Sequence, residues 1–387
     1  MVRKIIAIVV FLAAIISCST PEHNSGIYHL DIKTWPTKTI DLENVIKEIR
    51  IVPLETNPEC LMSYVGQMQF DGDTIVALDG ETNQILCFDR QGKFLRKFGT
   101  RGKGPGEYTT AAGILFNQEK SEILLNRSPA PRVNFFNPGG QFLRSVNQDF
   151  SGYRMRFIGK DLVAVHAGRF GFNKTNCELA VLDLNGKISK TYFPFKVPVQ
   201  GDGCFGFAEG TKPGSALYHR RFDYNIYELF ADRIDTLLTV DFGSAAIDTG
   251  AFLNTETADK LNEESGKIFG FSSLANTPDH LLANIYRNDG FRGVWVLDHQ
   301  SKNQLNLAMD SLASMGNFRG VPIHFPRHTN GSWFIADYEG IGWFEMIKTL
   351  SEDQKAILRK EVPGFMEAEK VTADGNPVLV YYRLKNF

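Results

Sequence analysis

Short segments of alternating hydrophobic and polar residues, separated by tight turns, fill most of the chain. In the stretch 73–108, DTIVALDGETNQILCFDRQGKFLRKFGTRGKGPGEY, two such segments, a turn and a third segment lead into a glycine-rich exit. Alternation with a period of two predicts β-strands that bury one face. The stretch therefore predicts a unit of short strands joined by turns, with no helix inside it.

The same unit returns downstream. Residues 121–146 align with the start of the first unit without a gap and place Gly140 where that unit has Gly92, 48 residues earlier. A third, looser copy has Gly186 at the same place, 46 residues after Gly140. A repeat of this length, built only from short strands, is typical of a blade in a β-propeller.

Strand, short turn, strand and glycine recur six times along the chain. The clear units lie at 65–99, 112–146 and 155–195, and the looser ones lie at 222–243, 280–299 and 331–338. Each unit of such an array contacts only its neighbours, so a chain of 387 residues can form one domain. We predict an all-β fold, a six-bladed β-propeller that spans residues 40–387.

The two ends of the propeller are expected to share one blade. The strand predicted at 47–54 has no partner nearby in the sequence, and another isolated strand is predicted at 377–384. Pairing of the N-terminal strand with the C-terminal strand would close the ring and remove its two open sheet edges.

Two inserts are compatible with short helices. The segment 255–265 is polar and has no strand pattern. A second helix is expected after Ser351, because Ser351 and Gln354 have the spacing of a capping box and Pro363 follows as a stop.

The N-terminus has the pattern of an export signal. Arg3 and Lys4 precede an apolar run, 5–16, that is short for a membrane span, so residues 1–17 are predicted to be a signal peptide. The segment 15–18 resembles the lipobox of bacterial lipoproteins, which implies cleavage before Cys18 and acylation of that residue. An ordinary signal peptide with an incidental cysteine is the alternative. Residues 18–39 are expected to form the lipidated cysteine and a flexible tether.

Charge and cysteine content restrict the partners. The net charge of −2 becomes −4 once residues 1–17 are removed, so no basic field favours a nucleic-acid partner. Cys60, Cys87, Cys177 and Cys204 are spaced too widely and irregularly for a metal module. Export would permit disulfides among them, but their pairing stays open.

The segment 99–108, GTRGKGPGEY, is the first candidate for a ligand site. Its glycines and two cations suggest a phosphate-binding loop, but the Gly-Lys-Ser/Thr ending and a following helix pattern are missing. We interpret it instead as the crossing between two blades, braced by Arg101 and Glu107. If a ligand binds near the mouth of the ring, Arg101, Glu107 and Tyr108 are the candidate contacts.

The histidines suggest a second, weaker candidate. His166, His219 and His324 fall in different predicted blades, and a propeller could bring three imidazoles together around a zinc ion with an open position. A hydrogen-bonded strand histidine is the commoner arrangement, so we expect no metal and no other cofactor.

Three segments carry a resemblance to a known family. VPLETNPE at 52–59, FDRQGKFLRKFGTRGKGPGEY at 88–108 and NPVLVYYRLK at 376–385 resemble the six-bladed β-propeller lipoproteins of Bacteroidota, which are similar in shape to NHL-repeat propellers. The resemblance implies an exported protein, anchored by lipid in the cell envelope and specifically in the outer membrane. It implies no particular activity.

Two functions are compatible with the sequence. We expect a monomeric binding or scaffold module for a glycan, a peptide or an envelope partner, because no GxSxG motif and no Cys/His signature offers a catalytic residue. The alternative is an enzyme that uses the axial pocket, either a metal-dependent lyase of the NHL-like type or a hydrolase. Pairs of carboxylates for glycoside hydrolysis stay open, since the sequence does not give their separation.

Overall fold

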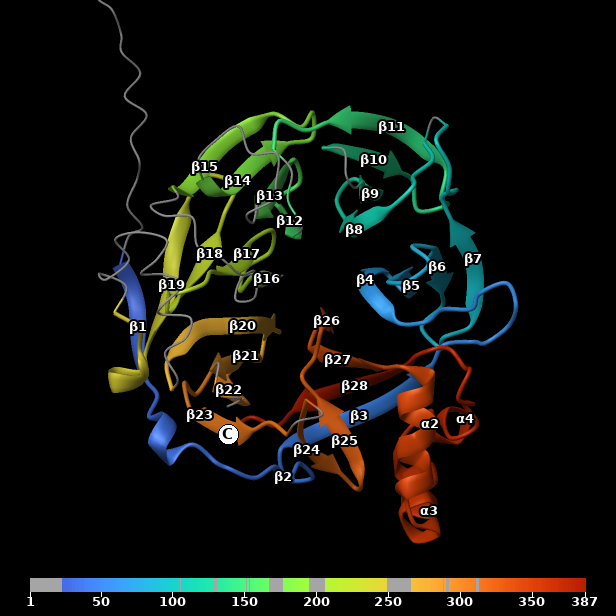
Figure 1. Ribbon diagram of the computed structural model, residues 1–387, viewed down its shortest axis with the longest axis vertical. Helices are drawn as coiled ribbons and strands as arrows, with labels where there is room; N and C mark the ends of the chain where they lie inside the picture. Colours follow the sequence, from blue (N-terminus) through green and yellow to red (C-terminus); the bar gives the residue numbers. More distant parts are fainter. Residues whose placement is uncertain are drawn as a thin grey trace, which may run out of the picture.

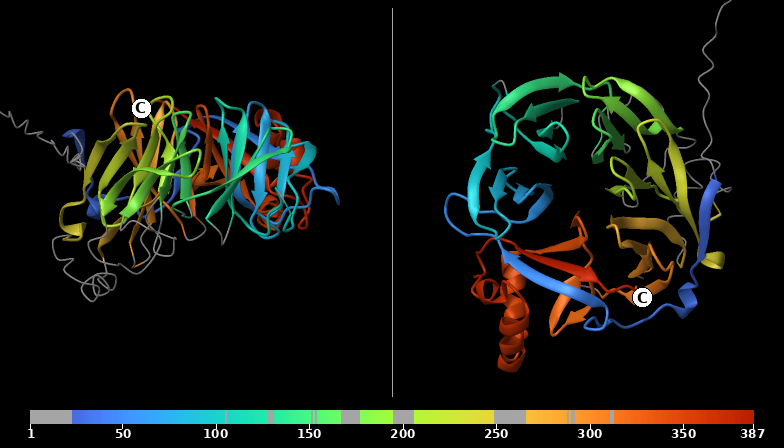
Figure 2. Two further views of the ribbon diagram at one scale, coloured as in Figure 1. Left: turned by 90° about the horizontal axis from the view of Figure 1, so that it is seen from above. Right: turned by 180° about the vertical axis from the view of Figure 1, so that it is seen from behind.

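The computed structural model describes residues 23–104, 106–127, 131–150, 152, 154–166, 177–194, 206–248, 266–287, 289, 292–310 and 313–387. These residues form sheets that stand side by side in a ring around a central axis (Figure 1). Seen from the edge, the ring is a disc whose strands run roughly across its thickness (Figure 2). The prediction of an all-β propeller is confirmed.

The first three sheets follow the predicted units closely. Each has four antiparallel strands, with its first strand innermost. The strands are β4 (Val65–Asp71), β5 (Thr74–Asp79), β6 (Ile85–Phe88) and β7 (Phe94–Phe98); β8 (Ala111–Asn117), β9 (Glu122–Arg127), β10 (Arg132–Phe136) and β11 (Phe142–Asn147); and β12 (Arg154–Ile158), β13 (Leu162–His166), β14 (Cys177–Asp183) and β15 (Ile188–Pro194).

The next two sheets contain the looser units. Their strands are β16 (Gly206–Glu209), β17 (Ala216–His219), β18 (Asn225–Leu229) and β19 (Ile234–Asp241); and β20 (Ile268–Asn276), β21 (His280–Arg287), β22 (Arg292–Asp298) and β23 (Gln304–Ala308). The strand β1 (His23–His29) joins the first of these sheets by pairing in parallel with β19.

The closing sheet joins the two ends of the chain as predicted. Its order is β26 (His328–Asn330), β27 (Trp333–Tyr338), β28 (Val378–Leu384) and β3 (Ile46–Pro53). The strands β28 and β3 are antiparallel, with Val380 opposite Ile51. The N-terminal strand therefore completes the sheet that contains the C-terminal strand.

The predicted number of six blades is wrong, because the described residues form seven sheets. The seventh has three strands, β2 (Ile40–Asp41), β24 (Ser314–Phe318) and β25 (Val321–His324), and lies on the outer side of the ring beside the closing sheet (Figure 1). Its parallel strand β2 has two residues and comes from the other end of the chain. Such a sheet has no local repeat that the sequence pattern could reveal.

The aligned glycines mark the turn between the third and fourth strands of a sheet. Gly92, Gly140 and Gly186 have φ of +85°, +88° and +77°. Each donates its N–H to the carbonyl three residues earlier, on Asp89, Asn137 and Asp183. A Cβ at Gly92 would also lie 2.2 Å from the carbonyl oxygen of Pro53. The repeat in the sequence is therefore a repeat of turn geometry that favours glycine.

Residues 23–42, here called the N-terminal strap, lie along the outer rim of the ring. The strap comprises β1, the short helix η1 (Ile32–Thr34) and β2. Trp35 anchors it: this residue is 3% exposed, and its Nε1 donates to the carbonyl oxygen of Leu307 at 2.9 Å. Residues 23–39 are thus packed on the sheets and do not form the expected flexible tether. The predicted signal peptide and Cys18 lie outside the described residues.

The helices gather beside the closing sheet. They are α2 (Gly340–Thr349), α3 (Glu352–Glu361) and α4 (Phe365–Ala368). The predicted capping box is confirmed, because Ser351 accepts from the Gln354 N–H while Gln354 accepts from the Ser351 N–H. The other expected helix, 255–265, lies outside the described residues. In the part of the chain that is described, every helix is too short or too polar to cross a membrane.

Hydrophobic side chains fill the spaces between neighbouring sheets. The rings of Phe98 and Phe136, for example, meet between the first two sheets with centroids 5.0 Å apart. Cys60 and Cys87 are fully buried as free thiols, and burial raises the pKa of Cys87 to about 11. Cys204 lies outside the described residues.

Deletion of the last twelve residues, 376–387, should abolish cooperative folding. It removes β28 from between β27 and β3, including five side chains that are at most 1% exposed, Val378, Leu379, Val380, Tyr381 and Tyr382. At about 1.5–3 kcal/mol for each side chain, the loss is comparable with the ~5–15 kcal/mol stability of a typical domain. Urea unfolding followed by circular dichroism, with the full chain as control, measures it. A truncated chain that unfolds cooperatively at an unchanged midpoint would contradict the role of ring closure.

Candidate functional site in the central channel

A channel with a volume of about 950 Å³ follows the axis of the ring. Its lining comes from the innermost strands of six sheets: β4, β8, β12, β16, β20 and β26 with the residues before it. The seventh sheet contributes none of the described lining residues. The innermost strand of a sheet has no neighbouring strand on its axial side, so its backbone edge and the side chains next to it border the channel.

The channel wall combines amide and hydroxyl groups with aromatic rings. Its polar members include Gln67, Gln69, Asn83, Asn126, Thr211, Ser272, Ser273, Asn276, Thr329 and Asn330, and its aromatic members include Phe70, Phe116, Phe157, Phe207 and Phe325. Amide and hydroxyl groups can both donate and accept hydrogen bonds. The wall is therefore suited to a small polar ligand rich in hydroxyl groups.

One end of the channel carries two arginines and two histidines. This end, here called the arginine mouth, is formed by Arg154, His219, Arg327 and His328. Arg154 is the first residue of β12, whereas Arg327 directly precedes β26, so the two cations come from different sheets. Arg327 pairs with Asp337, Nη1 to Oδ2, at 3.1 Å.

The charge of Arg154 is not neutralised by an ion pair of this kind within the described residues. Its side chain is exposed within the channel, and among the described residues no carboxylate forms an ion pair with it. Surrounding protein and the positive charge of Arg327 both lower the pKa of Arg154. The two guanidinium groups are therefore close enough to repel each other. An anion bound at this end would reduce that repulsion.

Three histidines lie at the same end and are neutral: His166 and His219 are buried, and His328 is nearly so. Burial is the main cause that lowers the pKa of His166, His219 and His328 to about 3, and nearby positive charge adds to it. His166 Nδ1 is 2.8 Å from the hydroxyl oxygen of Tyr218. Nδ1 of His219 is inaccessible to solvent, and the backbone of Phe271 lies near the ring and partly offsets the lowering of its pKa.

The rest of the channel is electrostatically balanced. Deeper inside, Arg156 forms an ion pair with Glu209, and burial lowers the pKa of Arg156 to about 10. Glu119 lines the opposite end, where the first two strands of each sheet are joined. The uncompensated positive charge is thus confined to the arginine mouth.

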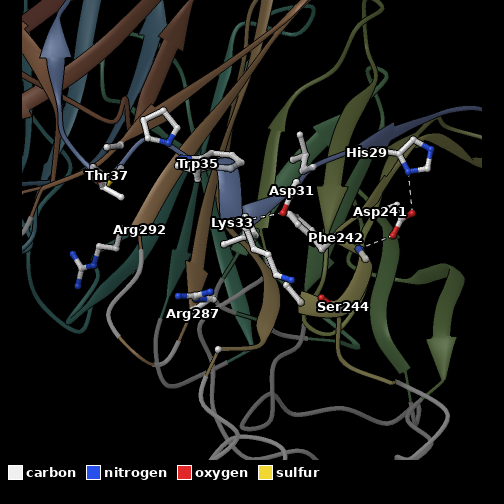
Figure 3. A pocket seen from close by; sticks show the side chains of 18 residues that line it. His29, Asp31, Lys33, Trp35, Thr37, Asp241, Phe242, Ser244, Arg287 and Arg292 are labelled. Carbon is white, nitrogen blue, oxygen red and sulfur yellow. Dashed lines mark hydrogen bonds and ion pairs between the residues drawn. The ribbon is translucent and has the colours of Figure 1, made fainter.

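A second hollow of about 790 Å³ lies on the rim beneath the N-terminal strap (Figure 3). The strap contributes His29 and Lys33, and the sheets contribute Asp241, Arg287 and Arg292. His29 Nδ1 lies 2.9 Å from Asp241 Oδ2, and Arg287 pairs with Asp289 at 2.8 Å. Figure 3 shows that Arg292 points away from Lys33 and Asp241. Because the strap itself forms one wall, this hollow depends on the strap staying docked.

The predicted ligand residues Arg101, Glu107 and Tyr108 lie in the connection from the outer strand β7 to the inner strand β8, as the crossing interpretation expected. Tyr108 is 1% exposed and packs in the core between two sheets. Glu107 accepts the N–H of Gly104 at 2.7 Å, and among the described residues it forms no ion pair with Arg101. None of the three lines the channel. As ligand contacts they stay a prediction.

The structure does not bring His166, His219 and His324 together. His324 lies in β25 and stacks on Tyr338, with ring centroids 4.3 Å apart. Only His219 of these three lines the channel. Across the described ranges, no three histidine, cysteine or acidic side chains are grouped so that they could hold a metal ion.

Sequence reasoning missed the arginines of the channel. The segment RMRFI places Arg154 and Arg156 on one face of a strand, which is a visible signal. Its meaning depends on knowing that β12 is the innermost strand. Arg327 gave no signal, because its neighbour Arg154 lies 173 residues earlier in the chain.

Comparison with known proteins supports the fold. A family model described as Domain of unknown function (DUF4934) matches residues 28–383, whereas no curated protein matches the sequence. A structure from Bacteroides fragilis, named as an exported protein, has a TM-score of 0.72 at 14% identity and covers 93% of this chain and 100% of its own. A DUF4221 member from Bacteroides vulgatus has a TM-score of 0.50 at 12% identity, with coverage of 89% and 98%. These neighbours support a β-propeller family of Bacteroidota and show the fold alone.

The buried histidines should make stability fall as the pH falls. Below about pH 6.5 an unfolded histidine takes up a proton, but these three stay neutral in the folded protein down to about pH 3. Above about pH 6.5 these histidines therefore leave the free energy of unfolding unchanged. Below that pH the free energy of unfolding falls by about 1.4 kcal/mol per pH unit for each histidine.

Replacement of one histidine isolates this effect from that of the carboxylates. In His219→Gln, the slope of unfolding free energy against pH between pH 6 and 4.5 should be smaller than in the native chain by about 1.4 kcal/mol per pH unit. His29→Gln, on the exposed strap, is the matched control. Urea unfolding at several pH values measures the slopes. Equal slopes in His219→Gln and the native chain would show that His219 is not held neutral.

Proposed function

Because this chain belongs to the DUF4934 family, whose description assigns no activity, we propose from its geometry that it is a binding module of the cell envelope that takes a small polar ligand into the arginine mouth of its channel. The uncompensated Arg154 in a channel walled by amide and hydroxyl groups is the observation that supports this proposal. A rigid ring with one electrostatically biased opening presents its contacts already in place, which reduces the entropic cost of binding.

Binding is favoured over catalysis by the state of the ionisable groups at the mouth. A general acid or base works best with a pKa near the working pH. The histidines here have pKa values of about 3, far below that range. Burial raises the pKa of Asp337, but its carboxylate pairs with Arg327 at 3.1 Å, so the described groups of the mouth are better suited to binding than to proton transfer.

An envelope location is part of the proposal. The predicted signal peptide supports export, and so does the similarity in fold to a Bacteroides fragilis protein that is named as exported. We propose that Cys18 carries the lipid and that the outer membrane is the target. Tests of lipid attachment and of ligand binding are independent of each other.

The position of β1 suggests how the disc faces the membrane. His23 lies opposite Thr236, and β1 then runs alongside β19 towards Asp241, at the end of the ring where the arginine mouth opens. Cys18 lies five positions before His23, a span of chain that reaches at most ~18 Å. An anchor at Cys18 would thus hold the opposite end of the disc nearer the membrane and leave the arginine mouth facing away.

Lipid attachment is tested by metabolic labelling. Radiolabelled palmitate should be incorporated into the native chain expressed in a Bacteroides host and should be absent from Cys18→Ser. Equal labelling of the variant would contradict the assignment of Cys18.

The channel as ligand site is tested by obstruction. Ser273→Trp places a large side chain in the channel, whereas Gln91→Trp places it on an exposed turn and is the matched control. Isothermal titration of the full chain in detergent with a panel of neutral and acidic oligosaccharides should show saturable binding that Ser273→Trp lowers at least tenfold and Gln91→Trp leaves unchanged. Binding that persists in Ser273→Trp would place the ligand elsewhere, and turnover of a bound compound would favour the enzyme alternative.

A further inference from the structure

The charge at the arginine mouth points to a particular ligand chemistry. Arg154 projects into the channel without an ion-pair partner in the described part, and its electrostatic neighbour is a second cation, Arg327. A guanidinium presents a planar set of N–H donors that matches a carboxylate, sulfate or phosphate group. An anion between the two arginines would relieve their repulsion.

The nearby carboxylates do not pair with Arg154 in place of a ligand anion. Asp337 is 6% exposed in its side chain and is held behind the mouth by Arg327, at 3.1 Å. Glu209 is occupied by Arg156. Arg154 is therefore the cation that stays available to a ligand, whereas the charge of Arg327 is partly neutralised.

His219 borders the same mouth but is closed to a ligand. Its side chain is 1% exposed, Nδ1 is inaccessible to solvent, and the backbone of Phe271 lies next to the ring. As a buried neutral group it leaves the positive charge of Arg154 unchanged.

The chemical groups in the channel wall restrict the class of ligand further. Beyond the mouth it offers amides and hydroxyls such as Gln69, Ser272 and Asn330, whereas Phe157 and Phe207 border the channel but pack against the cores between sheets. Amides and hydroxyls bind sugar hydroxyl groups. A volume of about 950 Å³ is at the upper end of the range for small-molecule sites.

We propose that the arginine mouth binds the anionic group of an acidic saccharide, with Arg154 as the principal contact and Arg327 as the second. The anionic group is a carboxylate, a sulfate ester or a phosphate ester, which share this chemistry. The inference rests on the proposed function, because it assumes that the channel is the ligand site.

The test compares Arg154→Gln with Arg292→Gln by isothermal titration of the full chain in detergent. Both variants remove one guanidinium, but Arg292 lies in the rim hollow beneath the strap. The probes are trigalacturonate, a sulfated trisaccharide, a phosphorylated trisaccharide and maltotriose as the neutral compound. Arg154→Gln should weaken binding of the preferred acidic probe about tenfold or more, Arg154→Lys should weaken it less, and Arg292→Gln should leave it unchanged.

A measurement on the native chain avoids any dependence on the folding of the variants. Binding of the preferred acidic probe should weaken as sodium chloride is raised, and inorganic sulfate should compete with it. Competition by sulfate alone, with no binding of any acidic saccharide, would mean a plain anion site and would overturn the saccharide assignment.

The remaining outcomes separate this inference from the proposed function. If acidic and neutral probes bind equally and Arg154→Gln has no effect, while Ser273→Trp still blocks binding, the channel binds a ligand but the anion assignment is wrong. If Arg292→Gln weakens binding and Arg154→Gln does not, the anion site is the rim hollow. If neither Ser273→Trp nor Arg154→Gln changes binding, the proposed function fails as well.

Discussion

The pairing of β3 with β28 is the constraint on which the rest of the structure depends. These strands come from opposite ends of the propeller, and their antiparallel ladder runs from Val378 opposite Pro53 to Leu384 opposite Ile46. Without it the closing sheet would lose its outer strand, and β26 and β27 would not be fixed relative to the first sheet. Asn376, fully buried, adds to this closure by donating to the carbonyl oxygens of Glu55 and Cys60.

Closure also creates the site. Arg154 and Arg327 belong to sheets that are not neighbours, and they line the same channel only because the ring is complete. The fold thus holds two like charges at one opening, an arrangement that an open array of the same sheets would not impose. A ligand anion would stabilise this arrangement, and so binding and ring geometry are coupled.

The sequence predicted those features that repeat locally. Gly92, Gly140 and Gly186 marked one turn in three sheets because each needs a positive φ, and Ser351 with Gln354 marked a helix start through a local hydrogen-bond pair. Features built from distant segments left no such signal. The two-residue strand β2, the docking of Trp35 at Leu307 and the meeting of Arg154 with Arg327 all depend on tertiary structure.

The most direct test of the account is a cross-link across the closing ladder. Arg383 lies opposite Glu48, at the exposed edge of the β3 and β28 pair. In the double variant Glu48→Cys with Arg383→Cys, mild oxidation of the folded full chain should form a disulfide between these positions, detected by mass spectrometry of a proteolytic digest. A folded chain in which the two cysteines stay unlinked under conditions that oxidise exposed thiols would contradict the closed ring.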